Sequence, residues 1–138
     1  MKIYFAGSIR GGRDDQELYF GMIAELQKYA TVLTEHIGNK DLGSFGEVQR
    51  TDTEIFVRDM DWVKEADLIV AEVTTPSLGV GYELGQSEAL GKPVLCLYRE
   101  TEGKRLSAMV SGNSYFKIET YQTLDDISRI LATYFEQK

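Results

Sequence analysis

The sequence predicts an α/β fold in which a mostly parallel sheet of five strands carries helices on both faces. Strand-like apolar runs alternate with amphipathic, helix-like segments along the whole chain. The 138 residues, 43% of them hydrophobic, can build one core but are too few for two. No internal repeat, low-complexity tract or Pro/Ser-rich linker breaks this order. We therefore expect residues 1–138 to form a single domain.

The first half of the chain predicts two strands and two helices. Residues 3–6 form a short apolar run that ends in a glycine-rich turn. Residues 14–29 then carry apolar side chains at three- and four-residue spacing, after acidic residues that suit a helix N-terminus. Residues 31–34 are rich in β-branched side chains and predict a second strand. A capping box at Thr51 to Glu54 begins a second helix, which we expect to end near Ala66.

The second half predicts three strands and two helices. Residues 68–71 form a nearly continuous apolar run, as in a central parallel strand that is covered on both faces. Residues 82–90 predict a helix that the following Gly-Lys-Pro ends. Residues 94–98 and 115–118 predict two further strands, and residues 124–135 a closing helix. With right-handed crossovers, this order gives a Rossmann-like or flavodoxin-like sheet.

Composition excludes several classes of partner and cofactor. The 15 Lys+Arg residues against 22 Asp+Glu give a net charge of −7, which disfavours binding to polymeric nucleic acid. No apolar run approaches the ~20 residues that cross a bilayer, and the chain opens on a strand-like run without a signal-peptide core. Cys96 and His36 are too few for a disulfide or a structural zinc site. We therefore expect a cytoplasmic protein without membrane partner, metal or cofactor.

Polar motifs follow three of the predicted strands, in the segments Gly7 to Arg13, Thr34 to His36 and Thr74 to Glu83. Ligands of open parallel sheets bind beyond the carboxyl ends of the strands, so we expect these segments to meet at one edge. The glycine-rich turn could hold a phosphate through backbone N–H groups, the Ser8 hydroxyl and the Arg10 guanidinium. Its spacing matches neither the dinucleotide nor the ATP-binding pattern, and an ordinary strand-to-helix turn explains it equally well.

Two carboxylates are candidates for catalysis. Glu83 falls in the first turn of its predicted helix, where the helix dipole keeps a carboxylate ionised and able to act as a nucleophile. The alternative is a glutamate that only stabilises its helix. Asp59 falls inside the apolar stripe of the preceding helix, where burial would raise its pKa toward that of a general acid. The alternative is that Asp59 caps or pairs with Arg58 or Lys64, or sits at the edge of the stripe.

A pair of carboxylates that needs no metal suits substitution at the anomeric carbon of a sugar. Tyr4, on the first predicted strand, could orient Glu83, although a buried tyrosine of the core is the commoner case. Ser77 and Gly79 offer a second helix N-terminus, which favours a small anionic ligand. Glu72, inside the predicted central strand, is assigned to structure.

Several motifs together carry a family resemblance: YFAGSIRGGR, LTEH, ADLIVAEVT, PSLGVGYELG, GKPVLCL, LSAM and the D-x-x-W spacing from Asp59. Along nearly the whole chain they resemble the 2′-deoxynucleoside 5′-phosphate N-hydrolases of the nucleoside 2-deoxyribosyltransferase superfamily. The resemblance implies cleavage of a deoxynucleoside monophosphate to free base and 2-deoxyribose 5-phosphate. It makes Glu83 the nucleophile of a glycosyl-enzyme intermediate. It implies that Asp59 assists protonation of the departing base and that Tyr4 orients Glu83.

The resemblance also implies how substrate and subunits are arranged. The residues that it assigns to substrate binding are Gly7, Ser8, Ile9, Arg10, Gly11, Gly12, His36, Ser77, Gly79, Ser107 and Met109. Among them, His36 approaches the base, and Ser107 reaches the phosphate from the neighbouring subunit of a homodimer. A deoxyribosyltransferase, a ribonucleotide N-glycosidase of the CMP type and a nucleotide sensor without turnover stay open as alternatives.

Overall fold

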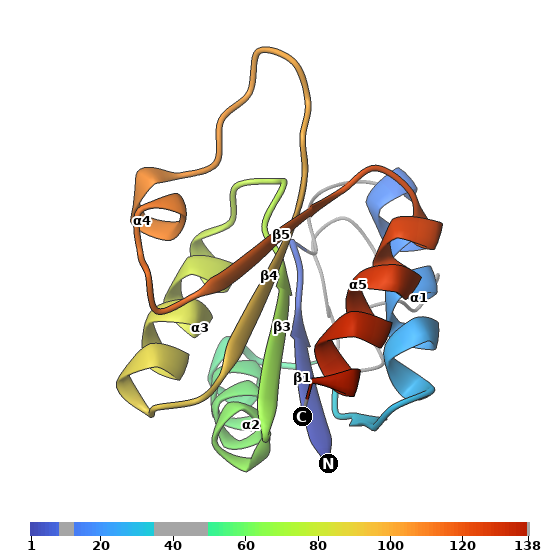
Figure 1. Ribbon diagram of the computed structural model, residues 1–138. Helices are drawn as coiled ribbons and strands as arrows, with labels where there is room; N and C mark the ends of the chain where they lie inside the picture. Colours follow the sequence, from blue (N-terminus) through green and yellow to red (C-terminus); the bar gives the residue numbers. More distant parts are fainter. Residues whose placement is uncertain (9–12, 35–49, 138) are drawn as a thin grey trace.

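Five strands form one sheet that is parallel throughout, in the order β2-β1-β3-β4-β5 (Figure 1). This computed structural model describes residues 1–8, 13–34 and 50–137. The strands are β1 (Lys2–Ala6), β2 (Thr31–Val32), β3 (Leu68–Glu72), β4 (Val94–Arg99) and β5 (Lys117–Tyr121). The predicted fold class is confirmed, and the sheet is parallel at every pairing.

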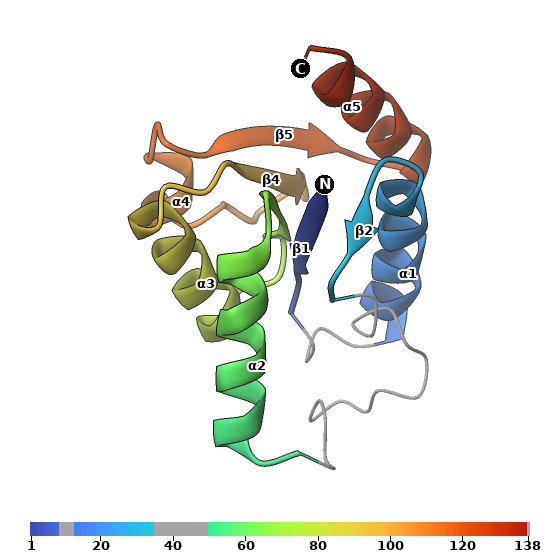
Figure 2. The ribbon, with the colours of Figure 1, turned by 90° about the horizontal axis from the view of Figure 1, so that it is seen from below.

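Helices cover both faces of this sheet. The described helices are α1 (Arg13–Gln27), α2 (Asp52–Glu65), α3 (Leu78–Ala89), α4 (Ala108–Ser111) and α5 (Leu124–Glu136). Helices α1 and α5 pack together on one face, and α2 and α3 lie on the other (Figures 1 and 2). Parallel neighbours need such crossovers, because the chain must return to the same end of the sheet before each strand.

The strands divide their side chains between two apolar layers. Along β1, Ile3 and Phe5 join the layer under α1 and α5, whereas Tyr4 and Ala6 join the layer under α2 and α3. This alternation follows from the two-residue period of a strand. It places the Tyr4 ring, which is almost fully buried, on the same face of the sheet as α3.

The second strand is shorter than predicted, because a side chain takes over its pairing. The ladder between β1 and β2 ends at Val32 rather than at residue 34. The fully buried Thr34 hydroxyl accepts a hydrogen bond from the Phe5 N–H at 2.8 Å and donates one to the Phe5 carbonyl at 2.7 Å. Thr34 therefore holds the chain beside β1 with its side chain instead of its backbone.

Helix α3 begins four residues before the predicted start at Tyr82. Its N-cap is Ser77, whose hydroxyl accepts a hydrogen bond from the Val80 N–H at 3.2 Å. A short helix, α4, also forms between the predicted strands 94–98 and 115–118, where we predict no helix, with Ser107 as its N-cap. Within the described ranges, no helix combines the length and the apolarity that crossing a bilayer requires.

Candidate active site

A cleft of about 530 Å³ opens at the carboxyl edge of the sheet, beside the ends of β1 and β3. These two strands are neighbours, but the chain leaves β1 for helix α1 on one face and leaves β3 for helix α3 on the other. Such a switch point is where open parallel sheets bind ligands. Gly7 and Ser8 line the cleft together with side chains of α2 and the segment from Pro76 to Glu83, as the sequence predicts for these parts of the edge.

Glu83 lies in this cleft and receives a hydrogen bond from Tyr4. The Tyr4 hydroxyl donates to a carboxylate oxygen of Glu83 across 79 residues of sequence. Because α3 starts at Leu78, Glu83 lies in the second turn, and our placement of it in the first turn is wrong. Its expected ionisation by the helix dipole is also overturned, since burial raises the pKa of Glu83 to about 8.

Asp59 lines the same cleft from helix α2, so the two candidate carboxylates share one cavity. Its expected burial in an apolar stripe is wrong, because the side chain is 25% exposed and is paired with Arg58. Two guanidinium nitrogens of Arg58 approach one carboxylate oxygen of Asp59 at 2.9 and 3.0 Å. The Arg58 guanidinium also lies 4.8 Å from the centroid of the Trp62 ring, which fixes its direction further.

The turn that follows β1 is held from beneath by a tyrosine that we did not single out in the sequence. The buried Tyr19 hydroxyl accepts a hydrogen bond from the Ser8 N–H at 3.1 Å, so this N–H is directed toward the core rather than toward a ligand. A Cβ at position 7 would lie 2.9 Å from the Tyr19 ring, which explains why a glycine occupies this position. The only sequence signal for Tyr19 is its position on the apolar side of its helix.

Some predicted site residues lie outside the described parts of the chain. These residues are Ile9, Arg10, Gly11, Gly12 and His36. Among the described ones, Ser77 and Gly79 line the cleft at the N-terminus of α3. The first N–H groups of a helix have no partner within the helix, so this end of α3 offers donors to an anion.

Ser107 and Met109 line a second, neighbouring groove of about 530 Å³ between α3 and α4. Ser77 and Leu78 border both hollows, but Glu83 lines only the first. Met109 and Leu78 are 81% and 97% exposed, which is unusual for large apolar side chains. Within one chain, Ser107 therefore does not join the cavity that holds Glu83.

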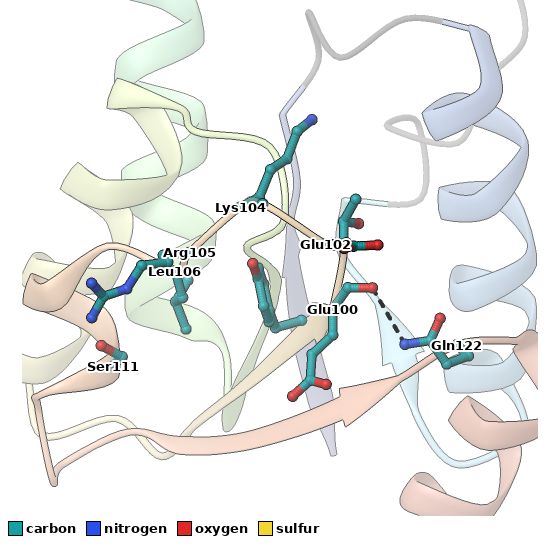
Figure 3. Close-up of a pocket in the computed structure, with 10 residues that line it drawn as sticks. Glu100, Glu102, Lys104, Arg105, Leu106, Ser111 and Gln122 are labelled. Atoms are coloured by element: carbon teal, nitrogen blue, oxygen red, sulfur yellow. Dashed lines mark hydrogen bonds between the residues drawn. The ribbon is translucent and has the colours of Figure 1, made fainter.

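A third hollow, of about 670 Å³, lies under the segment that joins β4 to α4 (Figure 3). The charged ends of Glu100, Lys104 and Arg105 point in different directions there, and the Gln122 amide donates to the Glu100 carbonyl at 3.3 Å. No residue that we predict for catalysis or binding lines this hollow. The first cleft is therefore the candidate active site.

One wall of that cleft is apolar. Ile55, Phe56 and Met60 of α2 face it together with Tyr82 of α3, and the rings of Phe56 and Tyr82 have their centroids 6.0 Å apart. Phe56 is 52% exposed, because this part of the predicted stripe borders the cleft instead of the core. An apolar wall in a cleft that also holds two carboxylates suits a ligand that has a flat ring at one end.

These features define a class of α/β protein with a doubly wound parallel sheet and an acidic small-molecule cleft at its switch point. Residues 3–117 match the family model described as nucleoside 2-deoxyribosyltransferase. The chain belongs to this family.

Curated relatives are similar along the whole chain. The 5-hydroxymethyl-dUMP N-hydrolase of Tetraodon nigroviridis is 52% identical over 142 residues, which cover 100% of this chain and 99% of the relative. The 5-hydroxymethyl-dUMP N-hydrolase of Homo sapiens is 46% identical over 138 residues, which cover 97% of this chain and 79% of the relative. The predicted family resemblance is confirmed.

Solved structures share the fold at low sequence identity. The CMP N-glycosidase of Clostridium botulinum is 19% identical with a TM-score of 0.68, over 97% of this chain and 99% of that one. A 2-deoxyribosyltransferase from Bacillus psychrosaccharolyticus is 22% identical with a TM-score of 0.68, over 93% and 90%. At these identities the likeness establishes the fold alone.

Proposed function

We propose that this protein hydrolyses the N-glycosidic bond of 2′-deoxynucleoside 5′-monophosphates to the free base and 2-deoxyribose 5-phosphate. One observation carries the proposal: Glu83 lies half-buried in the cleft at the switch point, is held by Tyr4 and shares that cleft with Asp59. A full-length relative at 52% identity is named as a 5-hydroxymethyl-dUMP N-hydrolase, so 5-hydroxymethyl-dUMP is the first substrate to test.

In the proposed mechanism, ionised Glu83 attacks C1′ as the bond to the base breaks, and a glycosyl-enzyme ester forms. Asp59 assists delivery of a proton to the departing base. Water then cleaves the ester, which releases the sugar phosphate and restores the carboxylate. The Tyr4 hydrogen bond favours the ionised form of Glu83, whereas burial favours the protonated form and raises its pKa to about 8.

The 5′-phosphate is proposed to bind at the N-terminus of α3. Ser77 and Gly79 lie there on the cleft, and the helix dipole favours negative charge at that end. Gly7 and Ser8 border the same cavity from the end of β1. Binding energy from the phosphate can position the reacting bond, although the phosphate takes no part in the chemistry.

We also propose a homodimer in which Ser107 completes the phosphate site of the neighbouring subunit. Ser107 lies outside the cavity of Glu83 in its own chain, and the groove beside it exposes Met109 and Leu78. Burial of such side chains between two copies would stabilise a dimer.

Mixed dimers test this arrangement. Glu83→Gln and Ser107→Ala chains, each of low activity alone, should regain about a quarter of the wild-type kcat/KM when they are mixed and exchanged, because one site per mixed dimer is complete. No recovery in demonstrably mixed dimers would place Ser107 in its own subunit's site. A monomeric, fully active protein at micromolar concentration would refute the dimer.

The hydrolysis itself is tested by chromatography of free base. Purified protein is incubated with 5-hydroxymethyl-dUMP, the natural deoxynucleoside and ribonucleoside monophosphates, and the deoxynucleosides. We expect base release from the deoxynucleoside monophosphates, its loss in Glu83→Gln and its retention in Glu136→Gln, an exposed position of α5 away from the cleft. Release only from unphosphorylated substrates, and only with a second base present, would instead identify a transferase.

A further inference from the structure

A cluster of polar side chains, three of them buried, lies behind the candidate site, on the opposite face of the sheet. It comprises Asp15, Tyr19, Glu72, Arg99 and Tyr121, at the carboxyl ends of β3, β4 and β5 and the start of α1. The proposed catalysis uses none of these side chains. Burial of polar groups is unfavourable unless they are hydrogen-bonded, so their partners indicate what the cluster does.

Two of these side chains hold the two segments that lead from the sheet into the cleft. At the end of β1, the Tyr19 hydroxyl accepts the Ser8 N–H at 3.1 Å. At the end of β3, one Glu72 carboxylate oxygen accepts the Thr74 N–H at 2.8 Å, and the other accepts the Thr74 hydroxyl at 2.7 Å. In each segment, the second residue after the strand is thus held by a side chain from the opposite face of the sheet.

The Glu72 carboxylate is fixed in this position by a further hydrogen bond. Its second carboxylate oxygen also accepts the Tyr121 hydroxyl at 2.6 Å, and the side chain is 2% exposed. The Thr74 hydroxyl in turn accepts the Arg99 N–H at 2.9 Å, which ties the same segment to β4. A carboxylate that accepts three hydrogen bonds is held in a single orientation.

The next residue in the β3 segment is fixed from α1. The Thr75 hydroxyl donates to Asp15 at 3.1 Å, and the Arg99 guanidinium lies 3.9 Å from the other oxygen of Asp15. Only Pro76, with its restricted φ, then separates Thr75 from Ser77, the N-cap of α3. A displacement of Thr74 and Thr75 would therefore be passed on to Ser77.

From these contacts we propose that Tyr19 and Glu72 are positioning residues, which set the distance between the Ser8 and Ser77 segments so that both meet the 5′-phosphate of one ligand. The inference rests on the proposed function, because it takes the phosphate ester as the ligand of these two segments. Neither side chain lines the cleft, so both act through the residues that they hold.

The test measures binding of 2-deoxyribose 5-phosphate by isothermal titration calorimetry, and separately KM and kcat for a deoxynucleoside monophosphate. Tyr19→Phe removes one acceptor and keeps the ring. Glu72→Gln presents an amide donor where a hydroxyl donor now points. Tyr115→Phe is the matched control, because it loses a 2.6 Å hydrogen bond to the Lys92 carbonyl away from the cleft.

Tyr19→Phe and Glu72→Gln should each weaken sugar phosphate binding and raise KM by about tenfold, with kcat changed less than twofold. Tyr115→Phe should leave all three values unchanged. A purely structural role would lower the melting temperature without changing the Kd of the folded fraction, and that result would overturn the inference. A lower kcat at unchanged KM would also overturn the inference.

The experiments distinguish a failure of the positioning inference from a failure of the proposed function. If the wild type hydrolyses nucleotides and the variants bind the sugar phosphate as tightly as it does, the inference is wrong and the function stands. If the wild type binds the sugar phosphate but hydrolyses no nucleotide, the function is wrong, and weaker binding in the variants still supports the positioning role. If the wild type binds no sugar phosphate, the inference is overturned.

Discussion

Replacement of Glu83 by Gln should stabilise the protein, and the gain should grow with pH. Burial raises the pKa of Glu83 from 4.5 to about 8. Between these values the carboxyl is protonated in the folded protein but ionised in the unfolded chain, so the free energy of unfolding falls as pH rises through this window. Glu83 lowers the free energy of unfolding by about 2 kcal/mol at pH 6 and by about 5 kcal/mol at pH 9, since each pKa unit corresponds to about 1.4 kcal/mol.

Neutral Gln has no such penalty, so the stability difference between Glu83→Gln and the wild type should widen by roughly 3 kcal/mol from pH 6 to pH 9. Urea unfolding of both proteins at pH 6 and pH 9, at one protein concentration, measures this difference in the free energy of unfolding. Subtraction of the wild type removes the contributions of other titrating groups. The same titrations of Glu136→Gln, an exposed position of α5, serve as the control. A Glu83→Gln difference that is constant with pH would refute the burial argument.

Catalysis and the glycines offer three more tests. The kcat/KM should rise with pH toward a plateau above about 8, because Glu83 must lose its proton, and Tyr4→Phe should shift this profile upward by removing a hydrogen bond to the ionised form. Gly7→Ala should lower the free energy of unfolding by about 1–3 kcal/mol in urea titrations, because its Cβ would meet the buried Tyr19 ring. Gly85→Ala should raise it by about 0.5–1 kcal/mol, since its Cβ would meet nothing. A flat pH profile, or equal effects of the two alanines, would contradict these arguments.

The order of strands and helices could be predicted because each central strand is a continuous apolar run. Residues 68–71 and 94–98 show it most clearly, and both runs are buried. The sequence predicts a start of α3 that is four residues too late, because Gly79 and Gly81 are poor helix formers and indicate a turn. Their weak propensity is overcome by the Ser77 cap and by burial of Val80 against the sheet.

The location of the cleft follows from topology, but the electrostatics within it could not be predicted. Periodicity places Asp59 in an apolar stripe, yet that part of α2 borders an open cavity, where Arg58 can reach the carboxylate. The pKa of Glu83 depends on burial beside Tyr4, which is 79 residues away in sequence. The Tyr4–Glu83 contact is expected from the sequence, but the degree of burial that sets this pKa leaves no local pattern in a single sequence.

The short second strand has a consequence for the behaviour of the sheet at its borders. Strands at the border of a sheet can recruit further strands and so begin aggregation. On one side, β2 presents only Thr31 and Val32. On the other side, β5 carries Lys117 and Glu119, whose charged groups lie 4.0 Å apart and are about half exposed. In the part of the chain that the structure describes, one border strand is thus short and the other is charged, and both features disfavour pairing with a strand of another molecule.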